Sequence, residues 1–305
     1  MRTILSIRGG GIRGIIPCCC LIKLEEQLGG LTRDHIDFCA GTSTGSLLTA
    51  GIAAGIKASD LLKVYTDQSK KIFTPTGVIG DAKMVAEGFR FDPKHLRDVL
   101  AGTLGAAAAW TINDCPLRVL ISATAMNGHN WFFVRDHVPH NAGTTGKVHL
   151  VDAAVASSCG PTYFDHWTIA GIMGQTVRFF DGGVGGTANP AYQACVEAFE
   201  FDDYFTVSDT RLIDLGTGYF PGSDNPPGNL ISVIEWATGT LVDSSEDWVA
   251  SAVKRQWPAV VASPDQRVNP QLPSDIDEAD ISAIPALLQL GQQTAAGVDW
   301  TKLLK

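Results

Sequence analysis

Residues 35–50, HIDFCAGTSTGSLLTA, form the stretch that decides the fold. Within it, residues 41–45 (GTSTG) fit the pattern G-x-S-x-G, with an apolar run before them and a helix-forming apolar run after them. This order predicts a strand, a sharp turn and a helix, with the hydroxyl of Ser43 exposed at the start of the helix. Gly41 and Gly45 suit the turn because a side chain at either position would crowd it. The stretch therefore predicts a nucleophilic serine on an α/β fold.

A second glycine-rich turn lies near the start of the chain. Residues 3–7 (TILSI) read as a short buried strand, and residues 15–28 have helical character. Residues 8–14 (RGGGIRG) join the two. A glycine-rich turn between a strand and a helix leaves backbone N–H groups free, and the helix dipole adds positive charge there. The turn is therefore a predicted anion cradle.

Two interpretations of this cradle compete. Its glycine spacing, G-x-G-x-x-G, is also that of a dinucleotide-binding loop. That reading requires an acidic residue at the end of the second strand, and residues 36–40 end in the GTSTG turn instead. We therefore favour an oxyanion hole, in which amides around Gly10 and Gly11 stabilise the negative oxygen formed when Ser43 attacks a carbonyl.

The serine also needs a general base. Residues 176–180 (TVRFF) predict a buried strand that ends in Asp181-Gly182-Gly183, where a carboxylate suits contact with a serine at a neighbouring strand end. Capping of the next turn is an equally ordinary role for Asp181. An α/β-hydrolase would place its histidine after the acid, but the last histidine here is His166. We predict a Ser43–Asp181 dyad, with His166 as the alternative base.

Composition limits the classes of function. The 305 residues are 45% apolar, which suits one large α/β core, and the net charge of −9 without a basic block argues against a nucleic-acid surface. Seven cysteines without a C-x-x-C pair indicate neither zinc nor a disulfide framework and fit a reducing compartment. His129, His137 and His140 match no standard metal spacing. With no signal peptide and no apolar run of about 20 residues, we expect a cytoplasmic protein that meets lipid only at a surface.

Other elements follow from local patterns. Asp92-Pro93 is a strong helix start, and Ser59 is a candidate N-cap for a helix over residues 60–71. Strands are predicted at residues 117–125, 131–135 and 212–215, and a helix at 150–156. Beyond residue 220 we expect a loop at 221–227, then helices at 229–241, 244–257 and 276–293, the last disturbed by Pro285. The prediction is one domain over 1–305, with a catalytic core at about 3–220 and a helical covering layer at about 221–305.

Three motifs in order carry a family resemblance. Residues 9–14 (GGGIRG), 41–45 (GTSTG) and 181–183 (DGG) together resemble the patatin-like phospholipases, whose pattern is D-G-G-G-x-R-G, G-x-S-x-G and D-G-[GA]. Residues 156–164 (ASSCGPTYF) and 215–218 (LGTG) are similar to two further blocks of that family. The resemblance covers about residues 3–220. It implies a three-layer α/β/α fold with a mostly parallel central sheet.

The resemblance also implies a function: hydrolysis of lipid acyl esters, of the phospholipase A, lipase or carboxylesterase type, without a metal or cofactor. Ser43 would be the nucleophile and Asp181 the base, and the partner would be a lipid or other acyl-ester substrate met at a membrane periphery. The loop over residues 74–88 is a candidate wall for the acyl chain. Oligomeric state stays open. The implied oxyanion loop comprises Gly9, Gly10, Gly11, Ile12, Arg13 and Gly14.

Two departures from the family pattern matter. Arg8 stands where the family usually has Asp, and the spacing from Asp181 to Asn189-Pro190 is longer than usual. Arg13 matches the loop arginine, which would hold the loop, favour nearby negative charge or form a surface salt bridge. Arg8 leaves open a lipid-binding or storage protein of low turnover, and the G-x-G-x-x-G spacing leaves open a nucleotide-binding oxidoreductase.

Overall fold

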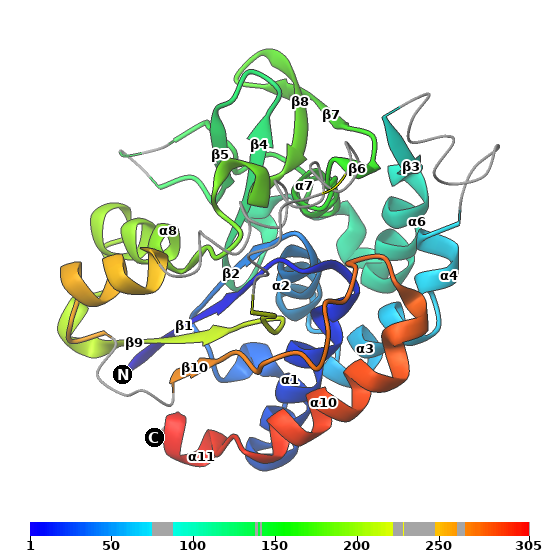
Figure 1. Ribbon diagram of the computed structural model, residues 1–305. Helices are drawn as coiled ribbons and strands as arrows, with labels where there is room; N and C mark the ends of the chain where they lie inside the picture. Colours follow the sequence, from blue (N-terminus) through cyan, green and yellow to red (C-terminus); the bar gives the residue numbers. More distant parts are fainter. Residues whose placement is uncertain are drawn as a thin grey trace.

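The central element is a mixed sheet that is mostly parallel (Figure 1). The computed structural model describes residues 1–74, 88–137, 140, 142–221, 228, 248–260 and 266–304. Within them an eight-stranded sheet has the order β10-β9-β1-β2-β4-β8-β7, with β5 paired to β4. Strands β10, β9, β1, β2 and β4 run parallel, and β5, β7 and β8 add antiparallel pairs. The strands are β1 (Arg2–Ile7), β2 (Phe38–Thr42), β4 (Arg118–Ala125), β5 (Asn130–Phe133), β7 (Trp167–Ile172), β8 (Gln175–Asp181), β9 (Thr210–Leu215) and β10 (Arg267–Val268). A separate pair joins β3 (Phe89–Phe91) to β6 (Thr162–Phe164).

Helices cover both faces of the sheet, which confirms the predicted three layers (Figure 1). Side chains alternate between faces along each strand. Leu5 and Cys39 therefore join the larger core beneath α1, α2 and α10, whereas Ile4 and Phe38 face α8 and the helical residues 248–256. The helices are α1 (Ile15–Leu28), α2 (Thr44–Ala54), α3 (Ala58–Thr66), α4 (Ser69–Ile72), α6 (Pro93–Leu104), α7 (Leu150–Ser157), α8 (Ala191–Val196), α10 (Ile284–Ala296) and α11 (Trp300–Leu303). Among the described residues, none of the helices has the length and apolar character needed to cross a membrane.

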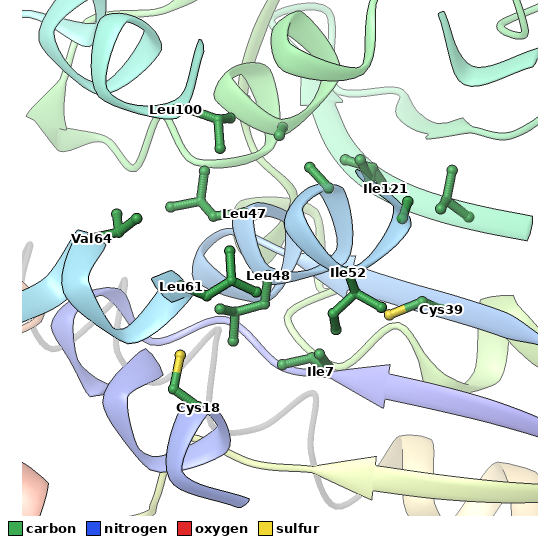
Figure 2. Packing of buried hydrophobic residues seen from close by; sticks show 14 of the residues in the cluster. Ile7, Cys18, Cys39, Leu47, Leu48, Ile52, Leu61, Val64, Leu100 and Ile121 are labelled. Atoms are coloured by element: carbon green, nitrogen blue, oxygen red, sulfur yellow. The ribbon is translucent and has the colours of Figure 1, made fainter. Parts of the chain in front are cut away.

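Helix α2 is the most deeply buried of the helices that matter for the site (Figure 2). Every residue from Thr44 to Ala53 is buried. Leu48 and Ile52 lie over Ile7 of β1 and Cys39 of β2, while Leu47 faces Leu100 of α6 (Figure 2). A helix enclosed on all sides can be apolar all round. Its first residue is therefore held rigidly at the end of β2.

The parallel register brings three loops to one edge of the sheet. Ile7 at the end of β1 pairs with Gly41 in β2 and with Leu215 at the end of β9. The loops that follow these strands therefore leave the same edge side by side. They contain the glycine-rich turn, Ser43 and the LGTG sequence, and ligands of open α/β sheets bind at this carboxyl edge.

The structure corrects several expected boundaries in the first half of the chain. The second strand begins at Phe38 and continues through Thr42, because Asp37 binds Thr3 through both its amide and its carboxylate before the ladder starts. The helix expected over 60–71 is two helices, α3 and α4, and Lys57, not Ser59, is the N-cap. The hydroxyl of Thr66 donates to Asp67 (2.7 Å), a local bond that competes with continued helix. The strand at 131–135 ends at Phe133.

Strand β8 is less buried than TVRFF suggests. Only Phe179 and Asp181 of this strand are buried, and β8 forms a hairpin with β7, a strand that was not predicted. The helical expectation for the C-terminal region is also wrong in part. Residues 267–268 form β10 and join the sheet, and Pro285 begins helix α10 instead of disturbing it. Residues 75–87, 222–227 and 229–247 lie outside the described residues, and with them most of the loop at 74–88, nearly all of the loop at 221–227 and the helix at 229–241.

Candidate active site

Ser43 lies in a strained turn between β2 and α2. Its backbone has φ 54° and ψ −125°, a conformation that L residues rarely adopt outside functional sites. Both flanking glycines are required by space: a Cβ on Gly41 would lie 2.2 Å from the carbonyl oxygen of Gly45, and one on Gly45 would lie 2.1 Å from that of Ile7. The sequence GTSTG thus produces a turn that presents the Ser43 side chain at the helix start.

Three other serines hold this strained peptide in place. The amide of Ser43 donates to Ser157 Oγ (2.9 Å) at the end of α7. Its carbonyl accepts from Ser46 Oγ (2.6 Å) and from Ser158 Oγ (3.0 Å). Ser157 and Ser158 belong to the sequence block at 156–164, whose family resemblance does not by itself assign them this role. Their adjacency is the sequence feature that could have indicated it.

Asp181 ends β8 beside Ser43. Asp181 pairs with Ala123 of β4, and its amide donates to the carbonyl of Cys159 (3.0 Å). The carboxylate accepts the amide of Gly183 (2.7 Å) and lies beside the hydroxyl of Ser43, which lowers the pKa of Asp181. Asp181 therefore caps the turn at Gly182–Gly185 and lines the same pocket as Ser43.

Burial changes the acid strength of Asp181. Loss of solvent raises the pKa of its carboxyl from 3.8 to about 7 and outweighs the hydrogen bonds from Ser43 and Gly183, which lower it. The nearby carboxylate of Glu278 raises the pKa of Asp181 further. A carboxyl with a pKa near neutrality accepts a proton from a hydroxyl more readily than an ordinary aspartate does.

The glycine-rich turn presents two amides that are free to bind an anion. The amide of Gly9 donates to Ala188, that of Ile12 to Glu278 (2.7 Å) and that of Arg13 to Gly10. Across the ranges that the structure covers, the amides of Gly10 and Gly11 have no hydrogen-bond acceptor. The turn approaches the serine closely, since a Cβ on Gly9 would lie 3.2 Å from that of Ser43.

Gly10 and Gly11 are packed closely against other parts of the chain. A Cβ on Gly10 would lie 2.3 Å from Thr217 Oγ1, and one on Gly11 would lie 2.3 Å from the carbonyl oxygen of Glu278. Both positions therefore need glycine. Gly14 is equally enclosed, because a Cβ there would lie 2.3 Å from Thr44 Oγ1.

Arg13 is buried and holds the loop from within. Its Nε donates to the carbonyl of Gly10 (3.2 Å), and its Nη2 pairs with Glu278 Oε1 (3.2 Å). The alternative of a surface salt bridge does not describe this contact, because only 9% of Arg13 is exposed.

Arg8 has a partner that explains its presence. It forms a buried two-pronged ion pair with Asp214 in β9, which also accepts from Asn189 (3.2 Å). Asn189 belongs to the longer-than-usual segment after Asp181. The two departures from the family pattern thus meet in one buried network behind the glycine loop. Thr217 also supports this loop, because its hydroxyl donates to the carbonyl of Gly9 (2.6 Å).

An apolar pocket opens at Ser43 and Asp181. Its described walls enclose a cavity of about 50 Å³. Such a space suits the first carbons of an acyl chain. Its apolar walls come mainly from α2, α3, α4, α6 and β6: Leu47, Val64, Ile72, Phe73, Leu96 and Phe164.

His166 does not line this pocket. Its Nδ1 lies 2.7 Å from Asp165 Oδ1, and its ring contacts Phe180. The structure therefore does not bring the alternative base to the serine. In the part of the chain that is described, no three His, Cys, Asp or Glu side chains gather as a metal site would require, and all seven cysteines are buried thiols.

Comparison with known proteins identifies the family of the chain. The family model of patatin-like phospholipase matches residues 5–194, so the chain belongs to the patatin-like phospholipase family.

Similar curated proteins include two cGAMP-activated phospholipases. The one from Escherichia coli (strain TW11681) is 31% identical over 227 residues, covering 70% of this chain and 61% of its own. The one from Vibrio cholerae is 32% identical over 235 residues, covering 70% and 63%. Patatin-17 of Solanum cardiophyllum is 31% identical over 210 residues, covering 63% and 51%. The chain thus spans about three fifths of the length of the two phospholipases.

Among solved structures, VipD from Legionella pneumophila has a similar fold. The superposition has a TM-score of 0.50 at 11% identity and covers 99% of this chain and 66% of that one. At this identity the similarity concerns the fold alone.

Proposed function

We propose that the protein hydrolyses acyl esters of lipids through a Ser43–Asp181 dyad. The observation that carries this proposal is the position of Ser43 beside a buried Asp181 with a pKa of about 7, in the lining of an apolar pocket. Membership of the patatin-like phospholipase family supports it, as do relatives named as phospholipases. The names of those relatives give their substrate class, phospholipids, which we extend to this chain.

The proposed reaction has two halves. Ser43 Oγ attacks the ester carbonyl carbon while its proton passes to the Asp181 carboxylate. The carbonyl oxygen becomes negative and accepts from the amides of Gly10 and Gly11. The protonated Asp181 then gives its proton to the departing alcohol as the C–O bond breaks, which leaves an acyl-enzyme. Water attacks the acyl-enzyme as Asp181 takes one of its protons. Asp181 then returns this proton to Ser43 Oγ as the bond to the acyl group breaks, which releases the acid and free Ser43.

The same residues define the remaining parts of the proposal. Gly9, Ile12, Arg13 and Gly14 shape the oxyanion loop without donating to the substrate, and Gly41 and Gly45 shape the elbow. We propose a single domain over residues 1–305, supported by β10 from the C-terminal region joining the sheet. We propose a cytoplasmic protein that acts at the periphery of membranes. None of these steps calls for a metal or cofactor.

The test is release of fatty acid from vesicles of phosphatidylcholine and phosphatidylglycerol, with p-nitrophenyl butyrate as a soluble ester. Because the relatives are named for activation by cGAMP, each assay is run with and without that nucleotide. We expect hydrolysis by the wild type and loss of at least about 10³-fold in Ser43→Ala. Vesicle binding without release of fatty acid in either condition would support the lipid-binding alternative and contradict the proposal.

A further inference from the structure

The segment that contains β10 and leads to α10 passes the site. This segment, residues 266–280, is here called the C-terminal strap. It begins beside β9, where the amide of Gly216 donates to the carbonyl of Val268 (2.7 Å). The strap then follows the LGTG loop, with the amide of Leu272 donating to Tyr219 (2.7 Å). It runs on towards α10, in orange in Figure 1. This segment lies outside the family match at residues 5–194.

The strap touches the glycine loop at Glu278. The carbonyl of Glu278 accepts from the amide of Ile12 (2.7 Å), and its carboxylate pairs with Arg13 (3.2 Å). One residue earlier, Asp277 Oδ2 accepts from the hydroxyl of Tyr163 (2.8 Å), which lines the pocket. The strap thus joins the oxyanion loop to the opposite wall of the pocket.

The contact with Arg13 controls the direction of one proposed oxyanion donor. Arg13 donates to the carbonyl of Gly10 through both its Nε (3.2 Å) and its amide (3.0 Å). This carbonyl and the amide of Gly11 belong to one planar trans peptide and point in opposite directions. Fixing the carbonyl of Gly10 therefore aims the amide of Gly11. Arg13 in turn is held in place by the Glu278 carboxylate.

We propose that Glu278 is a positioning residue for the hydrolysis, which acts through Arg13 to orient the Gly10–Gly11 peptide of the oxyanion hole. This inference rests on the proposed function of Ser43 and Asp181. It assigns a role in the reaction to a residue 265 positions away from Arg13.

Glu278 has a second effect on the same site. Its negative charge raises the pKa of Asp181, so removing the charge lowers that pKa. Because this effect is a direct action of charge, the acid limb of the rate profile reports the charge of Glu278 and not the orientation of the peptide. Retention of kcat by a neutral hydrogen-bond acceptor at position 278 separates a positioning role from a structural one.

The experiment compares Glu278→Ala and Glu278→Gln with Asp280→Asn, which removes a charge from the end of the strap away from the loop. Asp280 binds only Ser282 and its own turn among the described contacts. We expect Glu278→Ala to lower kcat about tenfold, less than removal of a whole oxyanion donor, with KM within twofold. Glu278→Gln keeps a hydrogen-bond acceptor for Arg13, so it should keep more of kcat but still move the acid limb to lower pH. Asp280→Asn should match the wild type.

A double variant tests the path through Arg13. If both residues act through one ion pair, Arg13→Met combined with Glu278→Ala loses no more kcat than Arg13→Met alone. Additive losses would overturn the proposed path. A Glu278→Ala protein with kcat within twofold of wild type would overturn the positioning role itself.

Amide hydrogen exchange separates this inference from the proposed function. The peptide covering residues 8–14 should exchange faster in Glu278→Ala than in Asp280→Asn, whether or not a substrate is known. Unchanged exchange would refute the strap contact even in an active enzyme. If the wild type hydrolyses no ester but the two variants still differ in exchange, the proposed function is refuted. The strap contact is then structural only, which also contradicts a role of Glu278 in catalysis.

Discussion

Replacing Asp181 by asparagine should make the protein more stable at alkaline pH while it abolishes hydrolysis. Asparagine has the same shape and still accepts hydrogen bonds from Gly183 and Ser43, so the packing around the residue is retained. The variant removes only the cost of holding a negative charge in a buried site. Stability and activity should therefore change in opposite directions at this one position.

The size of the effect follows from the pKa of Asp181. The group titrates at about 7 in the folded protein and near 3.8 when unfolded, so the folded state binds the proton more tightly. Its contribution to stability is complete below pH 3.8 and is lost as the pH rises through about 7. At about 1.36 kcal/mol per pKa unit, the full loss is on the order of 4 kcal/mol, of which about 2.6 kcal/mol falls between pH 5 and pH 8.

Urea denaturation of wild type and Asp181→Asn at several pH values between 5 and 8 measures this difference. Other groups that titrate in this range, such as Glu197 with its pKa raised to about 7, are common to both proteins and cancel. As the pH rises, the free energy of unfolding of the variant should increase relative to that of the wild type by about 2 to 3 kcal/mol. A difference that does not depend on pH would refute a buried Asp181 with a raised pKa.

Three further predictions concern the rate, the loop and the buried ion pair. Because Asp181 must be ionised to accept a proton, kcat/KM should fall about tenfold from pH 8 to pH 6, and a flat profile would exclude it as the base. Gly11→Ala should lower kcat by at least about 100-fold, because the new Cβ would lie 2.3 Å from a backbone carbonyl of the C-terminal strap. Gly105→Ala is its control, since φ is +57° there with nothing within 4 Å, and it should cost about 1 kcal/mol of stability in urea without changing kcat. Arg8→Met should cost about 3 to 5 kcal/mol by leaving Asp214 buried without its cation, and Arg8→Met with Asp214→Leu should recover part of that; no recovery would mean that the pair is not the source of the loss.

The local features of the fold were predictable because short stretches encode them. Helix α1 spans Ile15–Leu28 as expected and ends at Gly29, whose φ of +73° suits glycine. Asp92 caps α6 by accepting from the amide of Lys94, as the Asp-Pro start signal predicts. The strand, turn and helix around Ser43 are equally local.

The closeness of Ser43 to Asp181 was also predictable, but only from several motifs taken in order. Each lies at a strand end, and the register of the sheet brings those ends together. Their roles in catalysis stay a prediction until they are tested chemically.

The parts that sequence reasoning missed depend on distant contacts. Glu278 meets Arg13 across 265 positions of the chain, and no local pattern marks it. Strand β10 has two residues, too few for any periodicity. Pro285 reads as a disturbance only when the helix is expected to begin well before it, at residue 276. In the structure it lies in the first turn of α10, a position that proline suits.

The most direct test of the central claim is labelling with a fluorophosphonate, followed by peptide mapping, at pH 8. The account predicts covalent modification of Ser43 in the wild type, none in Ser43→Ala, and labelling at least about 100-fold slower in Asp181→Asn. Labelling of Ser43 at an undiminished rate in Asp181→Asn, or no labelling of the folded wild type with or without cGAMP, would contradict an activated Ser43–Asp181 dyad.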